Sequence, residues 1–366
     1  MGWDYCTFIQ YPAAIAGLGP QGRRCAPSLP SGAGLGHSNL GITHRHRARR
    51  HVRPPADAAT CARVRQPFPR QGAPHDTTVA THCLPSHRCG RHPGGSRHPG
   101  QRAAHHRALV FSRSYRPDPL CPRRPRHGCG APPHIALQTF TWMLEGEILH
   151  RDSLGSKQVI RPGQVNLMTA GRGIAHTEES VPNQPDLHAA QLWIALPEAD
   201  QHTPPRFDHY PTLPRWQQGE ITLTLLIGEH GGRRAPTLHF SPILGLDLHA
   251  PEGGEITLPL DPSFEHGLFP LAGETIVAGE VLAPEQLLYL HPGNREVVLT
   301  LRPGARLLLI GGEPLPRPLQ IWWNFVSVDK EAIRTAAADW ESGHPRFGEV
   351  TGYQGPRLKA PPLTGL

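Results

Sequence analysis

The amino-acid composition of this chain changes abruptly near residue 133, and this change limits what each part can fold into. Residues 1–133 contain 20 Arg and 4 Asp but neither Lys nor Glu, which gives them a net charge of +16. The rest of the chain carries 17 of the basic and 26 of the acidic side chains, a net charge of −9. All seven cysteines lie at or before Cys129. The two parts therefore have to be interpreted separately.

Residues 1–131 are predicted to be a disordered basic segment. Pro, Gly, Arg and His dominate it, and its apolar residues follow neither the helical nor the strand period. Such a composition buries too little apolar surface to offset the entropy that is lost when a chain becomes ordered.

Three interpretations of this segment are open. A zinc site could use His82, Cys83, His87 and Cys89, although their spacing is irregular and the segment has no Cys-x-x-Cys pair. A basic arm could neutralise nucleic-acid phosphates, but such arms normally contain Lys as well as Arg. We favour the third interpretation, an out-of-frame translation, because Arg, Pro, Ala, Gly and His are what GC-rich DNA encodes in a wrong reading frame. Nucleic acid is therefore not an expected partner.

The composition also excludes some classes of protein. No run approaches the roughly 18–20 apolar residues of a membrane helix. The first residues have no basic region ahead of their short apolar stretch, so a secretory signal is not expected. Residues 134–366 contain no cysteine and cannot form disulfides, which favours a reduced, cytoplasmic setting.

From residue 139 onward, short apolar runs separated by Gly and Pro predict an antiparallel all-β fold. The order then recurs, because the Leu-Ala-Gly-Glu at 271–274 echoes the Leu-Glu-Gly-Glu at 144–147. We therefore expect two similar barrels in tandem and, after a run at 321–328, one helix at about 330–340. The main predicted strands are 139–144, 147–152, 165–168, 188–195, 221–227, 244–249, 296–301 and 306–310.

Three side chains in the first barrel are candidate metal ligands. His134 stands just before the first strand, and His176 and Glu178 lie two residues apart, which places both on one face of a strand. Imidazole and carboxylate ligands that leave open positions suit non-haem iron(II). The alternative from spacing alone is that these are ordinary polar residues at strand ends.

Several segments identify a family resemblance. They are PHIALQTFTW (133–142), LEGEI (144–148), HRDSLG (150–155), MTAGRGIAH (168–176) and LHAAQLW (187–193). Residues 132–340 resemble the pirin family, which implies two tandem cupin barrels (double-stranded β-helices) with one iron in the N-terminal barrel. The family's ligands are the two histidines of a His-Pro-His motif, then a His and a Glu. His134, His176 and Glu178 match three of these, but Pro132 occupies the remaining position, so Fe(II) is expected to bind weakly, one ion per chain.

The resemblance also implies a domain order. Residues 1–131 precede a metal-binding N-terminal cupin domain at 132–232, a metal-free C-terminal cupin domain at 233–328, and a helix with a tail at 329–366. If the chain exists as printed, the first barrel is expected to lack its N-terminal strands. In the second barrel, we expect ordinary polar residues rather than metal ligands at His239, His249, His266 and His291. Trp322, Trp323 and Phe325 are expected to pack in a core rather than to form a ligand cage.

Two functions are implied. The first is a quercetin 2,3-dioxygenase-like oxidoreductase acting on a flavonol, in which Glu178 also accepts the substrate's hydroxyl proton. The second is a non-catalytic, redox-sensitive regulator that binds a transcription factor or a metabolic enzyme. Both functions use the same iron site, so no sequence feature separates them.

Overall fold

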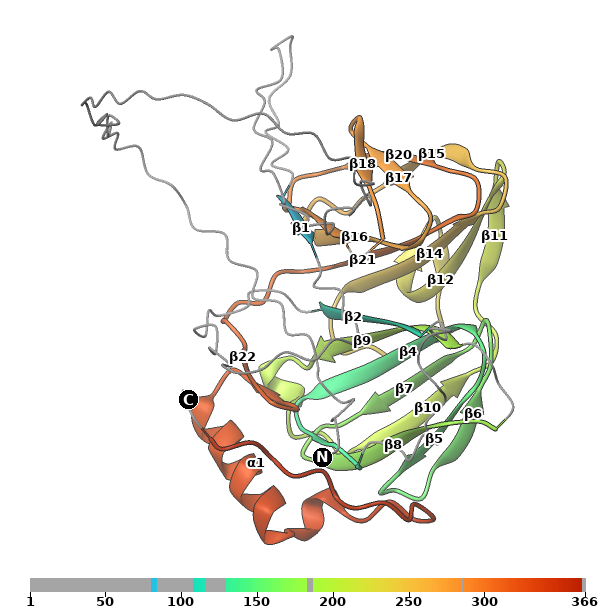
Figure 1. Cartoon of the computed structure of the whole chain (residues 1–366). Helices are drawn as coiled ribbons and strands as arrows, with labels where there is room; N and C mark the ends of the chain where they lie inside the picture. The colour runs from blue at the N-terminus through green and yellow to red at the C-terminus, as the bar shows by residue number, and fades with distance from the viewer. Residues whose placement is uncertain (1–79, 84–107, 116–129, 183–186, 285, 364–366) are drawn as a thin grey trace, which may run out of the picture. The chain divides into compact units, whose positions relative to one another are not determined.

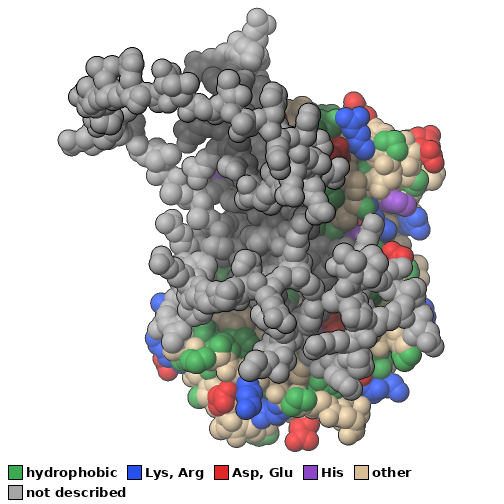
Figure 2. Space-filling model, in the orientation of Figure 1, with side chains coloured by type: hydrophobic (Ala, Val, Ile, Leu, Met, Phe, Trp, Pro, Cys, Tyr) green, Lys and Arg blue, Asp and Glu red, His purple; other side chains and the backbone are tan. Residues whose placement is uncertain are grey.

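The predicted all-β architecture with one C-terminal helix is confirmed by the computed structural model (Figure 1). Among the described residues, no helix is long and apolar enough to cross a membrane. Basic and acidic side chains lie next to one another on the described surface that Figure 2 shows. The structure describes residues 80–83, 108–115, 130–182, 187–284 and 286–363.

The first barrel consists of two antiparallel sheets. Their strand orders are β10-β7-β4-β9-β2 and β3-β8-β5-β6. A short 3-10 helix, η1 (Glu198–Asp200), precedes the last strand. The strands are β2 (Ala108–Tyr115), β3 (Pro133–His134), β4 (Leu137–Glu145), β5 (Ile148–Asp152), β6 (Lys157–Ile160), β7 (Val165–Thr169), β8 (Ile174–Ser180), β9 (Leu187–Ala195) and β10 (Arg206–Tyr210).

The second barrel repeats this plan. One sheet has the order β1-β19-β16-β21-β14-β12-β11, with β13 paired to β12, and the other has the order β15-β20-β17-β18. The strands are β1 (Ala80–Cys83), β11 (Arg215–Gln218), β12 (Ile221–His230), β13 (Arg233–Arg234), β14 (Ile243–Ala250), β15 (Gly254–Pro259), β16 (Glu265–Ala272), β17 (Thr275–Val277), β18 (Glu280–Leu282), β19 (Gln286–Leu290), β20 (Glu296–Leu301) and β21 (Ala305–Gly312).

The predicted helix is confirmed as α1 (Lys330–Ser342). The Asp329 side chain accepts a hydrogen bond from the Glu331 backbone N–H and caps its N-terminus, and Gly343 ends it with a φ of 73°. Its buried residues pack with Trp322, Trp323 and Phe325, so these aromatic side chains belong to a core, as predicted. The short 3-10 helix η2 (Pro345–Phe347) follows and adds Phe347 to the same core.

Two expectations need correction. Strands β1 and β2 lie inside the segment that was predicted to be disordered, and β2 pairs with β9 along the edge of the first barrel, where no N-terminal strand was expected. The sequence of β2, ALVFSRSY, is rich in strand-forming residues and accounts for the difference. Apart from β1, β2 and the residues from 130 onward, the predicted segment lies outside the described residues. So do His87 and Cys89 of the zinc interpretation.

The second correction concerns the domain boundary. Strands β11 and β12 pair into the sheet of the second barrel, so the boundary falls between β10 and β11 rather than at residue 232. The run at 321–328, for which no structure was predicted, forms a hairpin of β22 (Gln320–Trp322) and β23 (Phe325–Ser327). Trp323 adopts a φ of 52°, a turn conformation that interrupts the strand.

The interiors of the two barrels differ in chemistry. The second barrel is filled by a cluster of buried aliphatic side chains, including Leu246, Leu268, Leu299 and Leu307. Strands β4, β5, β8 and β9 of the first barrel instead carry polar side chains that bond to one another. Because buried polar groups need partners, a polar barrel interior is the natural place for a ligand site.

Candidate metal centre

The structure brings His134 and His176 together. Strands β3 and β8 are antiparallel neighbours, and they place both imidazoles in the first barrel, only 1% and 5% exposed. The Nε2 atoms of the two rings lie 3.1 Å apart. Two nitrogen ligands that each sit about 2.1 Å from one metal ion in adjacent positions are roughly 3 Å apart. The spacing of this pair therefore fits a shared ion.

A backbone carbonyl fixes the tautomer of His134. Its Nδ1 lies 3.0 Å from the carbonyl oxygen of Asn324, between β22 and β23. Because a carbonyl only accepts, Nδ1 carries the hydrogen and Nε2 offers its lone pair toward His176. Burial lowers the pKa of His134 well below its ordinary value, and the charge of a protonated His176 would lower it further. The ring is therefore held in the neutral form that binds metals.

Glu178 is engaged by two neighbouring strands. Its Oε1 accepts hydrogen bonds from Gln191 Nε2 on β9, at 2.6 Å, and from Thr141 Oγ1 on β4, at 3.2 Å. It lies on the same face of β8 as His176, two residues further along. The described residues nevertheless contain no group of three His, Cys, Asp or Glu side chains spaced to hold a metal ion. Two of the three predicted ligands thus converge, and the third has protein partners.

Position 132 lies against the same pair. Pro132 is buried, and its carbonyl oxygen accepts a hydrogen bond from the backbone N–H of His176 at 3.2 Å. Because residues 132 and 134 are two apart in extended chain, their side chains share a face. The residue that departs from the family's ligand set is therefore beside the two histidines, and a proline there supplies no donor atom.

The residue types present fit a transition-metal ion, although the set is short of one ligand. Two neutral imidazoles and one carboxylate suit iron(II), and their partners, the Asn324 carbonyl and Gln191, are of the kind that orient metal ligands. The geometry supports a converging imidazole pair, with the carboxylate of Glu178 two residues further along the same face of β8.

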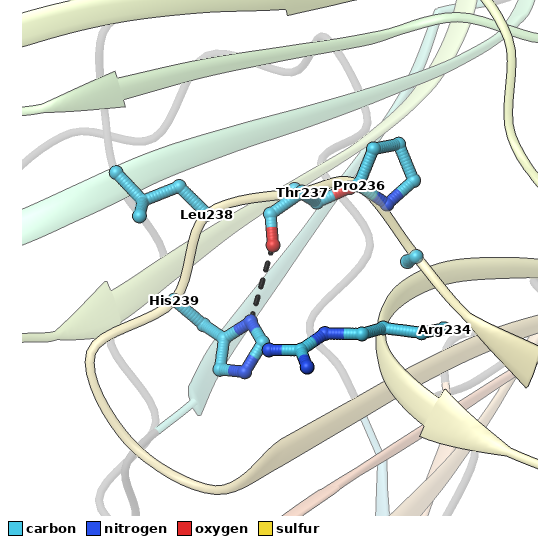
Figure 3. Close-up of a pocket in the computed structure, with 6 residues that line it drawn as sticks. Arg234, Pro236, Thr237, Leu238 and His239 are labelled. Atoms are coloured by element: carbon cyan, nitrogen blue, oxygen red, sulfur yellow. Dashed lines mark hydrogen bonds between the residues drawn. The ribbon is translucent and has the colours of Figure 1, made fainter.

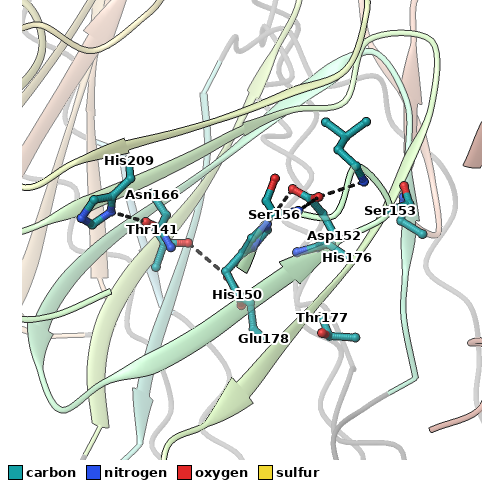
Figure 4. A network of polar contacts seen from close by, with 12 residues as sticks. Thr141, His150, Asp152, Ser153, Ser156, Asn166, His176, Thr177, Glu178 and His209 are labelled. Carbon is teal, nitrogen blue, oxygen red and sulfur yellow. Dashed lines mark hydrogen bonds and ion pairs between the residues drawn. The ribbon is translucent and has the colours of Figure 1, made fainter. Parts of the chain in front are cut away.

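Sequence reasoning missed two further polar pairs in this barrel (Figure 4). His150 Nε2 lies 3.1 Å from Asp152 Oδ2 on β5, and His209 Nδ1 lies 2.7 Å from Asn166 Oδ1 between β10 and β7. Burial would raise the pKa of Asp152, but the hydrogen bond and charge interaction with His150, together with the hydrogen bonds at Ser156, outweigh burial and lower this pKa. The i, i+2 spacing of His150 and Asp152 was the available signal, because it puts both on the inner face of β5.

A separate hollow of about 410 Å³ lies on the loop before β14. Figure 3 shows two of its lining residues, Arg234 and His239, side by side, and His239 Nδ1 lies 3.1 Å from the Thr237 carbonyl oxygen. This hollow is lined by consecutive residues 234–239 and includes none of the three predicted ligands.

Two tandem cupin barrels, with a buried imidazole pair in the first, define a bicupin. Comparison with known families gives two matches, the Pirin family over residues 93–194 and the Pirin C-terminal cupin domain over residues 245–348. The chain belongs to the pirin family. The first of these matches begins inside the segment that was predicted to be disordered.

Named relatives agree with this assignment. A Pseudomonas aeruginosa protein with the name "Putative quercetin 2,3-dioxygenase PA1205" is 55% identical over 234 residues, which cover 64% of this chain and 74% of that protein. A pirin-like protein of Caulobacter vibrioides is 36% identical and covers 60% of this chain and 77% of its own length. The crystal structure of quercetin 2,3-dioxygenase from Acinetobacter baumannii is 39% identical, with a TM-score of 0.64, and covers 71% of this chain and 96% of that one.

Proposed function

We propose that the first barrel binds one iron(II) ion through His134, His176 and Glu178, and that the chain is a quercetin 2,3-dioxygenase-type oxidoreductase. The observation that carries the proposal is the buried imidazole pair, whose Nε2 atoms lie 3.1 Å apart while the Asn324 carbonyl holds the other nitrogen of His134. The names of the 55% and 39% identical relatives support the choice of flavonol as substrate.

An iron(II) ion bound there would anchor the oxygen atoms of the substrate and supply Lewis-acid and redox chemistry toward O₂. Glu178 accepts the proton of the substrate hydroxyl, because carboxylate is the base nearest to the two histidines along β8. Gln191 and Thr141 hold Oε1 of that carboxylate, which leaves Oε2 as the oxygen that would face a bound ion and the substrate hydroxyl beside it. Trp193, packed edge-on against His134 with ring centroids 5.2 Å apart, forms an apolar wall beside the pair.

Replacing His176 with alanine is expected to abolish iron binding and quercetin turnover together. The variant loses one of the two converging nitrogen donors, which should weaken binding by more than the roughly 10–100-fold that loss of an outer partner costs. Iron content after anaerobic loading, measured by a chelator assay, and consumption of quercetin under O₂ provide the two readouts.

His249→Ala is the matched control, since it removes a histidine from β14 of the second barrel, and it should leave both readouts unchanged. Equal iron content in the wild-type chain and in His176→Ala would contradict the ligand assignment. Iron binding that depends on His176 without any consumption of quercetin would contradict the enzymatic assignment and favour the non-catalytic regulator.

A further inference from the structure

The first barrel contains a polar pair that the proposed metal site does not use. His150 and Asp152 lie on β5, and the antiparallel register places His150 opposite Glu178 and Asp152 opposite His176 on β8. Directly opposed residues in antiparallel strands point to the same face of the sheet. His150 and Asp152 therefore line the same interior as the predicted ligands, and the His150 ring centroid lies 5.5 Å from that of His176.

Both side chains are fixed in position. His150 is 3% exposed and Asp152 is fully buried. Asp152 Oδ1 accepts hydrogen bonds from the backbone N–H groups of Leu154 and Ser156, at 2.9 and 3.0 Å, and this leaves Oδ2 for His150. The ring of Phe207 stacks on the imidazole with centroids 4.3 Å apart and planes 14° apart. The carboxylate thus sets the direction of His150, and the phenyl ring sets its plane.

The partner of Nε2 determines what the other nitrogen can do. A carboxylate only accepts, so Nε2 of His150 carries the hydrogen and Nδ1 of the neutral ring is left as an acceptor. No hydrogen bond joins Nδ1 to another described residue. An acceptor whose orientation is fixed, in a polar interior and next to the imidazole pair, suits a hydroxyl group brought by a ligand.

We propose that His150, oriented by Asp152, accepts a hydrogen bond from a hydroxyl group of a planar aromatic substrate in the first barrel. This inference rests on the proposed function, because it places the substrate beside His134 and His176. His150 is then a substrate-binding residue and Asp152 a positioning residue. Phe207 stacks on His150 and extends the apolar wall that Trp193 begins beside His134.

Asp152→Asn separates this role from a purely structural one. The amide oxygen of the replacement can still accept the hydrogen bonds from Leu154 and Ser156, so the turn is retained. Its amide nitrogen donates, however, and a donor facing Nε2 moves the hydrogen of His150 to Nδ1. The variant keeps the shape of the site but turns its acceptor into a donor.

The primary measurement is equilibrium binding to the full chain, loaded with iron(II) and kept free of O₂ so that no turnover occurs. Quenching of tryptophan fluorescence reports binding of quercetin, which has hydroxyl groups, and of unsubstituted flavone, which has none. We expect Asp152→Asn to weaken quercetin binding by about 10-fold, the value of one well-placed hydrogen bond, and to leave flavone binding unchanged. The control is Asp261→Asn, which removes a carboxylate from an exposed turn where it likewise accepts a hydrogen bond, from the Ser263 backbone N–H. It should change neither the quercetin affinity nor the flavone affinity.

The second measurement is a long-range ¹H–¹⁵N NMR spectrum of the full chain before metal is added. We expect the Nε2–H tautomer of His150 in the wild-type chain and the Nδ1–H tautomer in Asp152→Asn, with the signals assigned by their loss in His150→Gln. A purely structural pair would not produce a tautomer change together with a loss specific to the hydroxylated ligand.

The inference and the proposed function fail in different ways. Turnover of quercetin by the wild-type chain together with equal quercetin affinities in wild type and Asp152→Asn overturns the inference alone. Absence of turnover together with a selective loss of quercetin affinity in Asp152→Asn overturns the proposed enzymatic activity and supports the inference. A wild-type chain that binds quercetin no better than flavone also overturns the inference.

Discussion

Replacing Pro132 with histidine is expected to tighten iron binding by about 100-fold or more. The position is buried, shares a face with His134, and bonds through its carbonyl to the backbone of His176, so a histidine there adds an imidazole beside the existing pair. A full protein ligand contributes more than the outer partners whose loss costs roughly 10–100-fold. The dissociation constant for iron(II), measured by competition with a calibrated chelator under anaerobic conditions, tests the expectation.

The control is Pro132→Ala, which removes the proline ring without adding a donor atom. If releasing the backbone from proline were the cause, both variants would bind iron equally well, and the interpretation of position 132 as a missing ligand would be wrong. If the added imidazole is the cause, Pro132→Ala binds no more tightly than the parent chain, and quercetin turnover rises only in Pro132→His.

Local patterns were sufficient to predict much of the fold. The helix was predicted from the spacing of Ile333, Ala336, Ala337 and Trp340, and these four are its buried residues. The position of most strands followed from apolar runs between turn residues, because a short run bounded by Gly and Pro has few other structures open to it.

The errors arose where a distant partner decides the outcome. The apolar pattern of β12 is the same whichever barrel it joins, and its assignment to the second barrel depends on pairing with β14. Strand β2 has a strand-forming sequence inside a segment of otherwise unfavourable composition, and its partner β9 lies far along the chain. A local pattern does not show which distant strand will be the partner.

The same limit applies to the site. The spacing of His176 and Glu178 predicted one strand face, but the tautomer of His134 depends on Asn324, 190 residues away in sequence. Glu178 is likewise held by Gln191, a residue on a different sheet whose role no local motif could indicate. The ligand types were thus predictable, whereas the partners that orient them were not.

Replacing His266 with leucine is expected to stabilise the chain, most of all in mild acid. His266 is 1% exposed, shares a face of β16 with Leu268, and neither ring nitrogen has a hydrogen-bond partner among the described residues. Burial lowers its pKa to about 4, although the carboxylates of Asp261 and Glu265 act in the opposite direction. Removing a buried polar group without partners should raise the free energy of unfolding by about 1–3 kcal/mol near neutral pH.

The acid dependence follows from the difference between the folded and unfolded pKa values. An unfolded histidine takes up a proton near pH 6.5, whereas folded His266 does so only near pH 4, so the unfolded state binds more protons in between. The wild-type chain should therefore lose stability as pH falls through this window, by roughly 2 kcal/mol between pH 7.5 and 5 from this residue alone. His266→Leu should lack that part of the loss.

Urea unfolding followed by tryptophan fluorescence at pH 7.5 and at pH 5 measures both effects. The control is His291→Leu, which removes a half-buried histidine of the same barrel. It shows whether the loss of any imidazole from the second barrel has the same effect on stability. The explanation requires the stability gap between His266→Leu and wild type to widen at pH 5. If the difference in free energy of unfolding between His266→Leu and wild type is the same at both pH values, His266 takes up its proton equally well in the folded and unfolded states. The folded second barrel would then accommodate a charged imidazole, which contradicts the explanation.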